Sequence, residues 1–269
     1  LSIFNTAWTM YDAMPAILKD AIEKIYLDKG FDLYFGGKPE DADFPCFEDL
    51  LKALPEVIQN SSYSAEVKGN YTGALVTRVK SLTNGLYRVI FGKNEIGDEI
   101  LFQENVIVDL SRIGSPETKA LLMGMLTMRL LEFRMCEGKV NSPLRHVTVL
   151  EEAHNLLKRE SSVGTGGNLR AASVEMIANA IAEMRTTGEG FIIADQSPSV
   201  LDMSVIRNTH TKVFFMLPDR NDREISGDSL TLNEAQKQEI ARLSPGVAVV
   251  YQNGWTRCRL KIVSVTSLF

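Results

Sequence analysis

Two adjacent carboxylates follow an apolar run in the middle of this 269-residue chain. Residues 147–154 read Val-Thr-Val-Leu-Glu-Glu-Ala-His, which predicts a strand that ends at Glu151 and Glu152. Adjacent acids repel each other, so an ordinary strand end seldom carries two. Mg²⁺ with a nucleoside triphosphate would compensate their charge, with Glu151 holding the metal through water and Glu152 polarising the attacking water. A solvated helix N-terminus, where the helix dipole favours acids, explains the pair equally well when it is taken alone.

A second polar element ends another predicted strand. The segment Phe191-Ile-Ile-Ala-Asp-Gln-Ser-Pro-Ser places Gln196 after an apolar run, and Pro198 starts the next element. In many nucleotide triphosphatases such a glutamine lies beside the γ-phosphate and senses it. The plainer alternative is a strand-to-turn junction that uses Gln, Ser and Pro for its turn, and this alternative is favoured while the segment is considered alone.

Two arginines could stabilise negative charge on a phosphate. Arg185 lies at a predicted helix end just before the strand of Gln196, where it could reach the phosphate of a neighbouring subunit as an arginine finger. Arg207 has a similar position at the end of a shorter predicted helix. For both residues the more common role is a favourable interaction with a helix C-terminus.

The loop that should hold the phosphates is missing from the sequence. No segment matches Gly-x-x-x-x-Gly-Lys-Ser/Thr, and the nearest candidate, residues 92–94, lacks both the spacing and the hydroxyl. The Gly-Thr-Gly-Gly segment at 164–167 lacks the lysine, so a flexible loop over Ser161–Asn168 is expected. The three histidines, His154 among them, form no ligand cluster, so structural or helix-surface roles are expected for them.

Composition sets broad limits on function. A net charge of −5 gives no overall attraction to nucleic acid or to an anionic membrane, so any DNA contact must use a local patch. Three cysteines without metal-like spacing fit a reducing, cytoplasmic setting. The longest apolar stretch, Ala120–Leu131, is short and carries Arg129, so no membrane span is expected. The chain begins without Met, which suggests that upstream residues were removed or not included.

Hydrophobic periodicity predicts a change of architecture near Asn105. Before it we expect helices over 12–29, 47–58 (bent or ended at Pro55) and 75–82, then two strands over 86–91 and 99–102. After it we expect strands over 106–110, 146–150, 190–194 and 212–217, which alternate with helices over 116–135, 171–185 and 200–207. A capping box of Thr231 and Glu234 should start a helix to Leu243, and a hairpin of 247–252 and 257–263, turned at Asn253-Gly254, should close the chain. Alternating strands and helices predict an α/β fold with a mostly parallel sheet and helices on both faces.

The order of these motifs resembles the HerA/FtsK superfamily of ring-shaped DNA-pumping ATPases, and most closely its HerA-like bacterial branch. The motifs are the Glu-Glu-Ala-His strand, Arg-x-x-Gly, Gln-x-Pro-Ser, Asn208-x-x-x-Lys and the late Leu243-Ser-Pro-Gly-Val-Ala turn. The resemblance covers roughly 106–263. Residues 1–105 look, more weakly, like the helical insertion that these ATPases carry between P-loop and Walker B, here with a small hairpin. Residues 106–269 would then be the C-terminal part of a RecA-like ATPase core, incomplete at its N-terminus.

The resemblance implies ATP with Mg²⁺, self-association into a ring that is a hexamer in this family, double-stranded DNA in a central pore, and a nuclease as a further partner. Glu151 and Glu152 match the Walker B acids, and Gln196 matches the sensor glutamine. Thr186 stands where the family often has a lysine after the arginine, which weakens the match of Arg185 to a finger.

Three functions are compatible with the sequence. The leading one is the motor portion of a HerA-type double-stranded DNA translocase or helicase, an ATPase in its full-length form and inactive as this fragment alone. The alternatives are the ATPase of a conjugative or type IV secretion machine, whose layout is similar, and a degenerate ATPase fold that serves as an oligomerisation module. The intact acid pair argues against the last.

Overall fold

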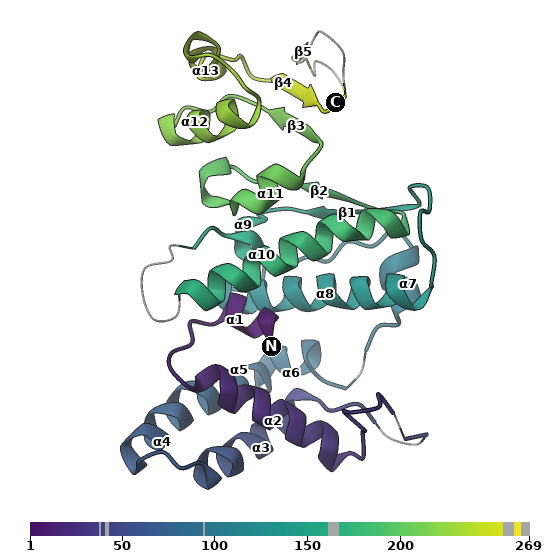
Figure 1. Ribbon diagram of the computed structural model, residues 1–269, viewed down its shortest axis with the longest axis vertical. Coiled ribbons are helices and arrows are strands. Elements are labelled where there is room, and N and C mark those ends of the chain that lie inside the picture. The colour runs from purple at the N-terminus through teal and green to yellow at the C-terminus, as the bar shows by residue number, and fades with distance from the viewer. Residues whose placement is uncertain (38, 41–42, 94, 161–166, 255–260, 265–269) are drawn as a thin grey trace. The chain divides into compact units, whose positions relative to one another are not determined.

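The computed structural model describes the chain except residues 38, 41–42, 94, 161–166, 255–260 and 265–269. The described residues form two compact units (Figure 1). One comprises Leu1 with Thr9–Glu104, and the other comprises Ser2–Trp8 with Asn105–Phe269. The short helix at the chain start therefore belongs to the second unit, although the sequence placed it with the helical region.

The first unit is helical. Leu50, Leu54 and Ile58 recur every four residues along one helix, and their side chains are buried, as expected for the core face of an amphipathic helix. Its elements are α2 (Met14–Asp28), α3 (Phe47–Asn60), α4 (Ala65–Tyr71), the π-helix η1 (Thr72–Val76), α5 (Thr77–Leu82), α6 (Gly85–Ile90) and α7 (Asp98–Gln103).

In the first unit the expected hairpin is wrong, and of the two alternatives expected at Pro55, a bend or an end of the helix, the end is excluded. The segments 86–91 and 99–102, expected to form a small hairpin, lie in the helices α6 and α7. Without a partner strand, a helix satisfies the backbone groups locally, and two acids in the first turn of α7 favour it further. Pro55 does not end α3, which continues to Asn60 because its buried face holds the helix together.

The second unit contains a parallel strand pair packed with long helices. The strands β1 (His146–Leu150) and β2 (Glu189–Ile193) pair in parallel with Leu150 opposite Ile193, so both strands end at the same edge. The helices around this pair are α1 (Ser2–Ala7), α8 (Pro116–Cys136), α9 (His154–Leu157), α10 (Gly167–Glu183) and α11 (Met203–Asn208), with the 3₁₀ turns η2 (Met184–Thr187) and η3 (Pro198–Val200). Helices α8 and α10 run alongside each other, and α1 packs against both (Figure 1).

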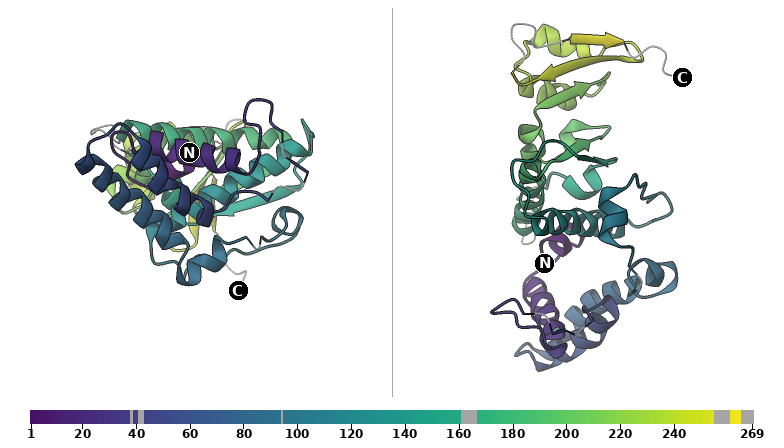
Figure 2. Two further views of the ribbon diagram at one scale, coloured as in Figure 1. Left: turned by 90° about the horizontal axis from the view of Figure 1, so that it is seen from below. Right: turned by 90° about the vertical axis from the view of Figure 1, so that its right-hand side faces the viewer.

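An antiparallel sheet follows at the C-terminal end of the chain, drawn green to yellow in Figure 2. Its strand order is β3-β4-β5, with β4 in the middle. Leu217, Leu230, Ile240 and Val249 form a buried apolar cluster beneath it. The elements are β3 (Thr211–Phe214), α12 (Arg220–Ser229), α13 (Glu234–Ile240), β4 (Val247–Gln252) and β5 (Lys261–Ser264).

The α/β class is confirmed, but the sheet differs from the expected one. The segment 106–110 forms no strand, and Ile107 is 94% exposed. A strand needs a neighbour for its backbone groups, and among the described residues this segment has none. The strand expected at 212–217 is β3, which pairs antiparallel with β4 rather than joining β1 and β2. Among the described residues the parallel part therefore consists of two strands. Val149 and Ile192 on these strands are each 54% exposed.

Smaller expectations are met or shifted. The helix expected from Thr231 begins two residues later, because Asn233 and Gln236 form the capping box and Thr231 has a φ of +57°. Of the expected loop Ser161–Asn168, residues 161–166 lie outside the described part of the chain, as do residues 255–260 of the closing hairpin. Among the described helices, none combines the length and the apolar composition that a membrane crossing requires.

Candidate functional site

Glu152 and Gln196 meet at the edge where β1 and β2 both end. Because the two strands are parallel and in register, the residues that follow them emerge side by side. The Gln196 side-chain amide donates a hydrogen bond from Nε2 to Oε1 of Glu152 at 2.7 Å. Both side chains are exposed, so solvent or a ligand can reach the carboxylate.

The backbone at Glu152 is left-handed, with a φ of +50°. This conformation is unfavourable for a residue with a side chain, by roughly 1 kcal/mol. Backbone hydrogen bonds surround it: Ala194 N–H donates to the Leu150 carbonyl at 2.9 Å, and Ala153 N–H donates to the Ala194 carbonyl at 3.2 Å. The chain therefore turns sharply between the two adjacent acids.

Asp195 joins the ends of the two strands. Its Oδ2 accepts hydrogen bonds from the backbone N–H of His154 at 2.8 Å and from the His154 ring Nδ1 at 2.9 Å. Its Oδ1 accepts from Ser197 N–H at 3.2 Å. The Asp195 side chain is 3% exposed, and His154 Nδ1 lies 3.6 Å from Oε2 of Glu152.

The sequence did not predict this role for Asp195 or for His154. It gave His154 a structural or helix-surface role and did not consider Asp195. The available signal was a carboxylate directly before Gln196 and a histidine two residues after Glu152, since the parallel register brings these positions together.

Glu151 lies beside this group with its carboxylate exposed. It makes no hydrogen bond or ion pair to the described residues. Oxygen donors suit Mg²⁺, which keeps several waters and takes one or two carboxylates together with substrate phosphates. Glu151 fits that requirement, because its carboxylate is not committed to another partner. No cluster of three or more His, Cys, Asp and Glu side chains that could hold a metal by itself occurs in the described ranges.

The loop after Gln196 is fixed to α12. Ser197 Oγ donates to both carboxylate oxygens of Asp222, at 2.7 and 2.9 Å. The backbone N–H of Ser199 donates to Oδ1 of the same carboxylate at 2.8 Å. Asp222 is buried, in the first turn of α12, so the segment that carries Gln196 is linked to the C-terminal part of the unit.

In the described part of the chain, neither arginine singled out in the sequence contacts Glu152 or Gln196. Arg185 lies in η2, before the amino end of β2, and its guanidinium is 3.4 Å from His210 Nε2. The length of β2 separates it from Gln196 within the chain. Arg207 lies in the last turn of α11 and is exposed. The structure therefore brings Glu152 and Gln196 into contact, with Glu151 next to Glu152 in the chain, and it shows no contact of Arg185 or Arg207 with them among the described residues.

A buried polar network occupies the opposite, amino-terminal end of the strands. Arg134 of α8 pairs with Glu189 of β2, Nε to Oε2 at 3.0 Å, and both side chains are at most 2% exposed. The other oxygen of Glu189 accepts from Thr148 Oγ1 at 2.8 Å and lies 2.7 Å from His146 Nδ1. Arg134 also donates to Glu137. This network joins α8, β1 and β2.

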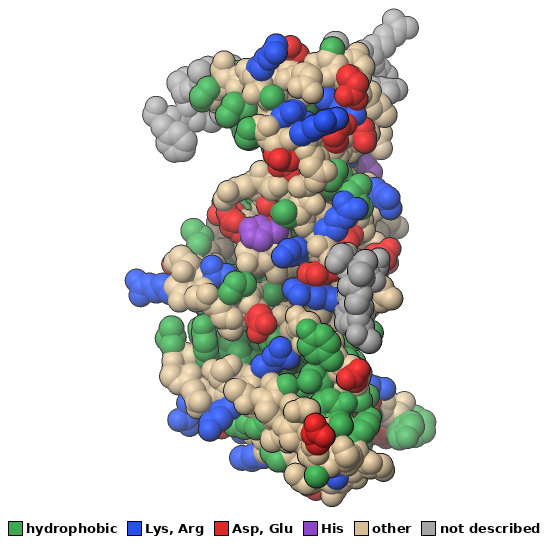
Figure 3. Space-filling view, turned by 90° about the vertical axis from the view of Figure 1, so that its left-hand side faces the viewer, with side chains coloured by type: hydrophobic (Ala, Val, Ile, Leu, Met, Phe, Trp, Pro, Cys, Tyr) green, Lys and Arg blue, Asp and Glu red, His purple; other side chains and the backbone are tan. Residues whose placement is uncertain are grey.

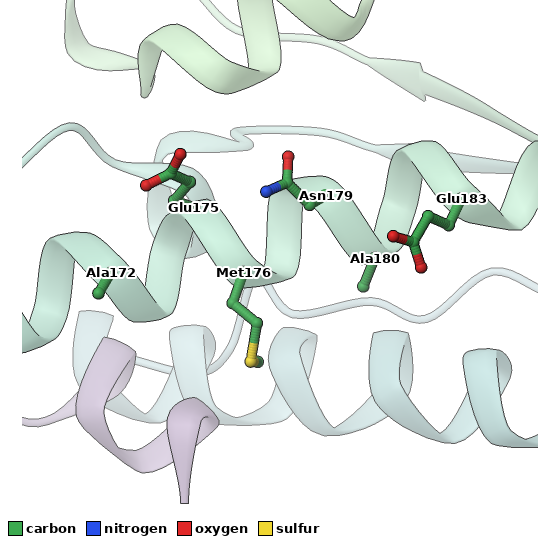
Figure 4. A pocket seen from close by; sticks show the side chains of 6 residues that line it. All are labelled: Ala172, Glu175, Met176, Asn179, Ala180 and Glu183. Carbon is green, nitrogen blue, oxygen red and sulfur yellow. The ribbon is translucent and has the colours of Figure 1, made fainter.

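The surface cavity found on α10 does not coincide with the acids. Its volume is about 370 Å³, and it is open to solvent along one helix. Figure 4 shows that Glu175 and Asn179 point one way and Met176 another, so the lining side chains do not converge on one point. Because no chemically matched set of groups faces this space, we assign the candidate site to the strand ends. The lining residues are Ala172, Glu175, Met176, Asn179, Ala180 and Glu183.

The α/β fold with this parallel pair is shared with a protein of known structure. The solved structure that carries this conclusion is VirB4 of Thermoanaerobacter pseudethanolicus, which matches with a TM-score of 0.65 and 15% identity over 99% of this chain and 67% of VirB4.

Other solved structures match less completely. B204, the DNA-packaging ATPase from Sulfolobus turreted icosahedral virus, matches with a TM-score of 0.41 and 15% identity over 67% of this chain and 76% of B204. The genome packaging NTPase B204 from Sulfolobus turreted icosahedral virus 2, in complex with AMPPCP, matches with a TM-score of 0.37 and 17% identity over 52% of this chain and 59% of B204. No protein-family model and no curated protein matches the sequence.

Proposed function

We propose that this chain is the Walker B and sensor half of an ATP-hydrolysing motor of the HerA/FtsK type that moves double-stranded DNA. The observation that carries the proposal is the contact between Glu152 and Gln196 at the shared edge of two parallel strands. In open α/β sheets, ligands bind at the carboxyl ends of the strands. A base next to a γ-phosphate sensor at that edge is the arrangement that ATP hydrolysis requires.

Each residue has a defined task in this proposal. Glu152 polarises the attacking water, Gln196 contacts the γ-phosphate, and Glu151 holds the metal ion through water. Mg²⁺ would neutralise charge on the phosphates when it is bound with ATP. Arg185 and Arg207 are left as candidates for contacts across a subunit boundary in a ring, because Arg185 lies at the other end of its strand and Arg207 is exposed.

A phosphate-binding loop must come from residues outside these 269. Backbone amides and a lysine are needed to neutralise the β- and γ-phosphates, and the sequence contains no such loop. Residues 1–269 alone should therefore hydrolyse ATP poorly. Exposed apolar side chains on β1 and β2 are consistent with a further layer that covers them.

DNA contact would depend on local groups. On the face that Figure 3 shows, Lys and Arg side chains are interspersed with Asp and Glu, without a uniform basic field. This mixture agrees with the net charge of −5. Binding through a few loops around a pore would suit such a surface better than binding along an extended groove.

The motor ATPase of a conjugative secretion machine is the second candidate. The likeness to VirB4 favours it, because it extends over 99% of the chain and so includes both units. The two candidates differ in their response to duplex DNA: a translocase of double-stranded DNA should hydrolyse ATP faster when double-stranded DNA is added, whereas a secretion motor that does not act on duplex DNA should not.

The proposal is tested on the longest natural polypeptide that contains this chain. Glu152→Gln should lower kcat by at least about 10³-fold, because the amide cannot act as a base, while the affinity for a fluorescent ATP analogue stays within threefold. Glu175→Gln, on the exposed face of α10, is the matched control and should leave both unchanged. Turnover by Glu152→Gln at the wild-type rate would remove Glu152 from this role and the proposal with it.

A further inference from the structure

We infer that Asp195 is a positioning residue for Glu152: its carboxylate holds the turn after β1 in the left-handed conformation that directs Glu152 toward Gln196. The inference rests on the proposed function for its catalytic consequence, but its structural part stands on geometry alone. Asp195 touches neither a substrate nor the reacting atoms in this proposal, and it acts through the backbone and the ring of His154.

The first support is the number of bonds that end on this one carboxylate. Three donors reach it: the backbone N–H and ring Nδ1 of His154, and the backbone N–H of Ser197. A carboxylate that is 3% exposed must have such partners, because an unpaired buried charge is costly. Two of the donors lie after β1 and one lies after β2, so the group fixes the two strand ends to each other.

The second support is the conformation of Glu152. A glutamate with a φ of +50° persists only where surrounding bonds enforce it. The bond of Ala153 N–H to the Ala194 carbonyl and the bond of His154 N–H to Asp195 directly follow this residue. Two side-chain bonds therefore act on this turn and can be removed by substitution: the one to Asp195, and one from Asn155 Nδ2 to the Glu152 carbonyl at 2.8 Å. Of these, the bond to Asp195 ties the turn to the end of β2.

The third support is the position of the His154 ring. Its Nδ1 lies 2.9 Å from Asp195 and 3.6 Å from Glu152. The carboxylate of Asp195 thus holds the N–H of Nδ1 on the side that faces both acids. The ring therefore lies next to the Glu152 carboxylate, on the side that Asp195 determines.

Two substitutions at position 152 test through thermal stability, without an enzymatic assay, whether the left-handed turn is enforced. Glu152→Ala and Glu152→Gly both remove the bond to Gln196, so they differ only in backbone preference. In a left-handed conformation glycine is the more stable, whereas elsewhere alanine is. The Tm of Glu152→Gly should exceed that of Glu152→Ala by about 2–4 °C. In an Asp195→Ala background this difference should vanish or reverse, and an unchanged difference would overturn the inference.

Steady-state kinetics on the longest natural polypeptide test the catalytic consequence. Asp195→Ala should lower kcat by at least about tenfold with the KM for ATP within twofold, since the base is misplaced but nucleotide contacts remain. Where the alanine variant does not fold, Asp195→Asn, which keeps one acceptor oxygen, should show a smaller loss in the same direction. Asp202→Asn removes a comparable carboxylate that caps α11 and should leave kcat within twofold.

The two proposals fail in different ways. If Glu152→Gln is inactive while Asp195→Ala and Asp195→Asn keep the wild-type kcat, the positioning role is wrong and the proposed function stands. If Glu152→Gln keeps wild-type turnover, the proposed function is wrong. The difference in Tm between Glu152→Gly and Glu152→Ala then still decides whether Asp195 enforces the turn.

Discussion

Replacing Glu189 with alanine should destabilise the second unit strongly, because it breaks a buried ion pair. The carboxylate accepts bonds from Arg134 of α8 and Thr148 of β1, and neither charged side chain is more than 2% exposed. Removal of one partner leaves a buried guanidinium with less compensation, which typically costs about 3–5 kcal/mol.

The expected magnitude lies at the lower end of that range. Arg134 still donates to Glu137 at 3.1 Å after the substitution, so its charge is not wholly uncompensated. The lost acceptor for the Thr148 hydroxyl adds about 1 kcal/mol, and the two effects are not independent. We therefore expect a loss of about 3 kcal/mol in the free energy of unfolding and a fall in Tm of roughly 6–12 °C.

Urea unfolding followed by circular dichroism measures this loss. Glu183→Ala, at an exposed glutamate at the end of α10, is the matched control and should cost less than about 0.5 kcal/mol. The double variant Arg134→Met with Glu189→Leu removes both charges and should cost less than Glu189→Ala alone. Two results would refute the buried pair as the source of stability. One is a loss of less than about 1 kcal/mol in the free energy of unfolding for Glu189→Ala. The other is a double variant that is less stable than Glu189→Ala.

Further predictions concern pH and two close backbone approaches. Hydrogen bonds from Arg145 lower the pKa of Glu137 to about 2. The ionised carboxylate therefore stabilises the folded state above pH 4.5, and this stabilisation is lost as pH falls from there toward 2. The stability difference between wild type and Glu137→Gln, about 1–2 kcal/mol at pH 7 in urea unfolding, should shrink over that range. Gly188→Ala should cost at least about 2 kcal/mol, because Gly188 has a φ of +84° and an added Cβ would lie 2.4 Å from a backbone carbonyl. Gly124→Ala should lower stability by about 1–3 kcal/mol, because its Cβ would lie 2.6 Å from the Ile3 side chain. Ile3→Ala in the same protein should restore part of the loss. Equal unfolding midpoints with and without Ile3→Ala would contradict a clash with Ile3 as the cause.

The strand that carries the acids could be predicted from sequence because its signal is local. Apolar runs ending in polar side chains predicted β1 and β2 within one residue at each end. Two such strands joined by a long helix predicted parallel pairing, and parallel pairing in turn places the residues after both strands at one edge. The proximity of Glu152 and Gln196 follows from that chain of inference.

Other elements could not be predicted because they depend on contacts that sequence patterns do not report. The segment 106–110 has the composition of a buried strand, yet it forms none without a neighbour to pair with. The β-branched and aromatic residues of α6 suggested a strand for the same compositional reason. The left-handed turn at Glu152 gives no signal, since glutamate is not a residue that favours it.

The contact between Glu152 and Gln196 also constrains how the proposed site could act. The Oε1 atom that accepts the amide hydrogen bond is half of the acceptor capacity of the carboxylate. A base that polarises water needs an oxygen free to accept its proton. Under the proposed function, Oε2 of Glu152 can accept that proton while Oε1 stays bonded to Gln196, and a turn of Gln196 toward the γ-phosphate would free Oε1 as well. Because the loop after Gln196 is bonded to Asp222 of α12, we expect such a turn to be transmitted to the C-terminal part of the unit.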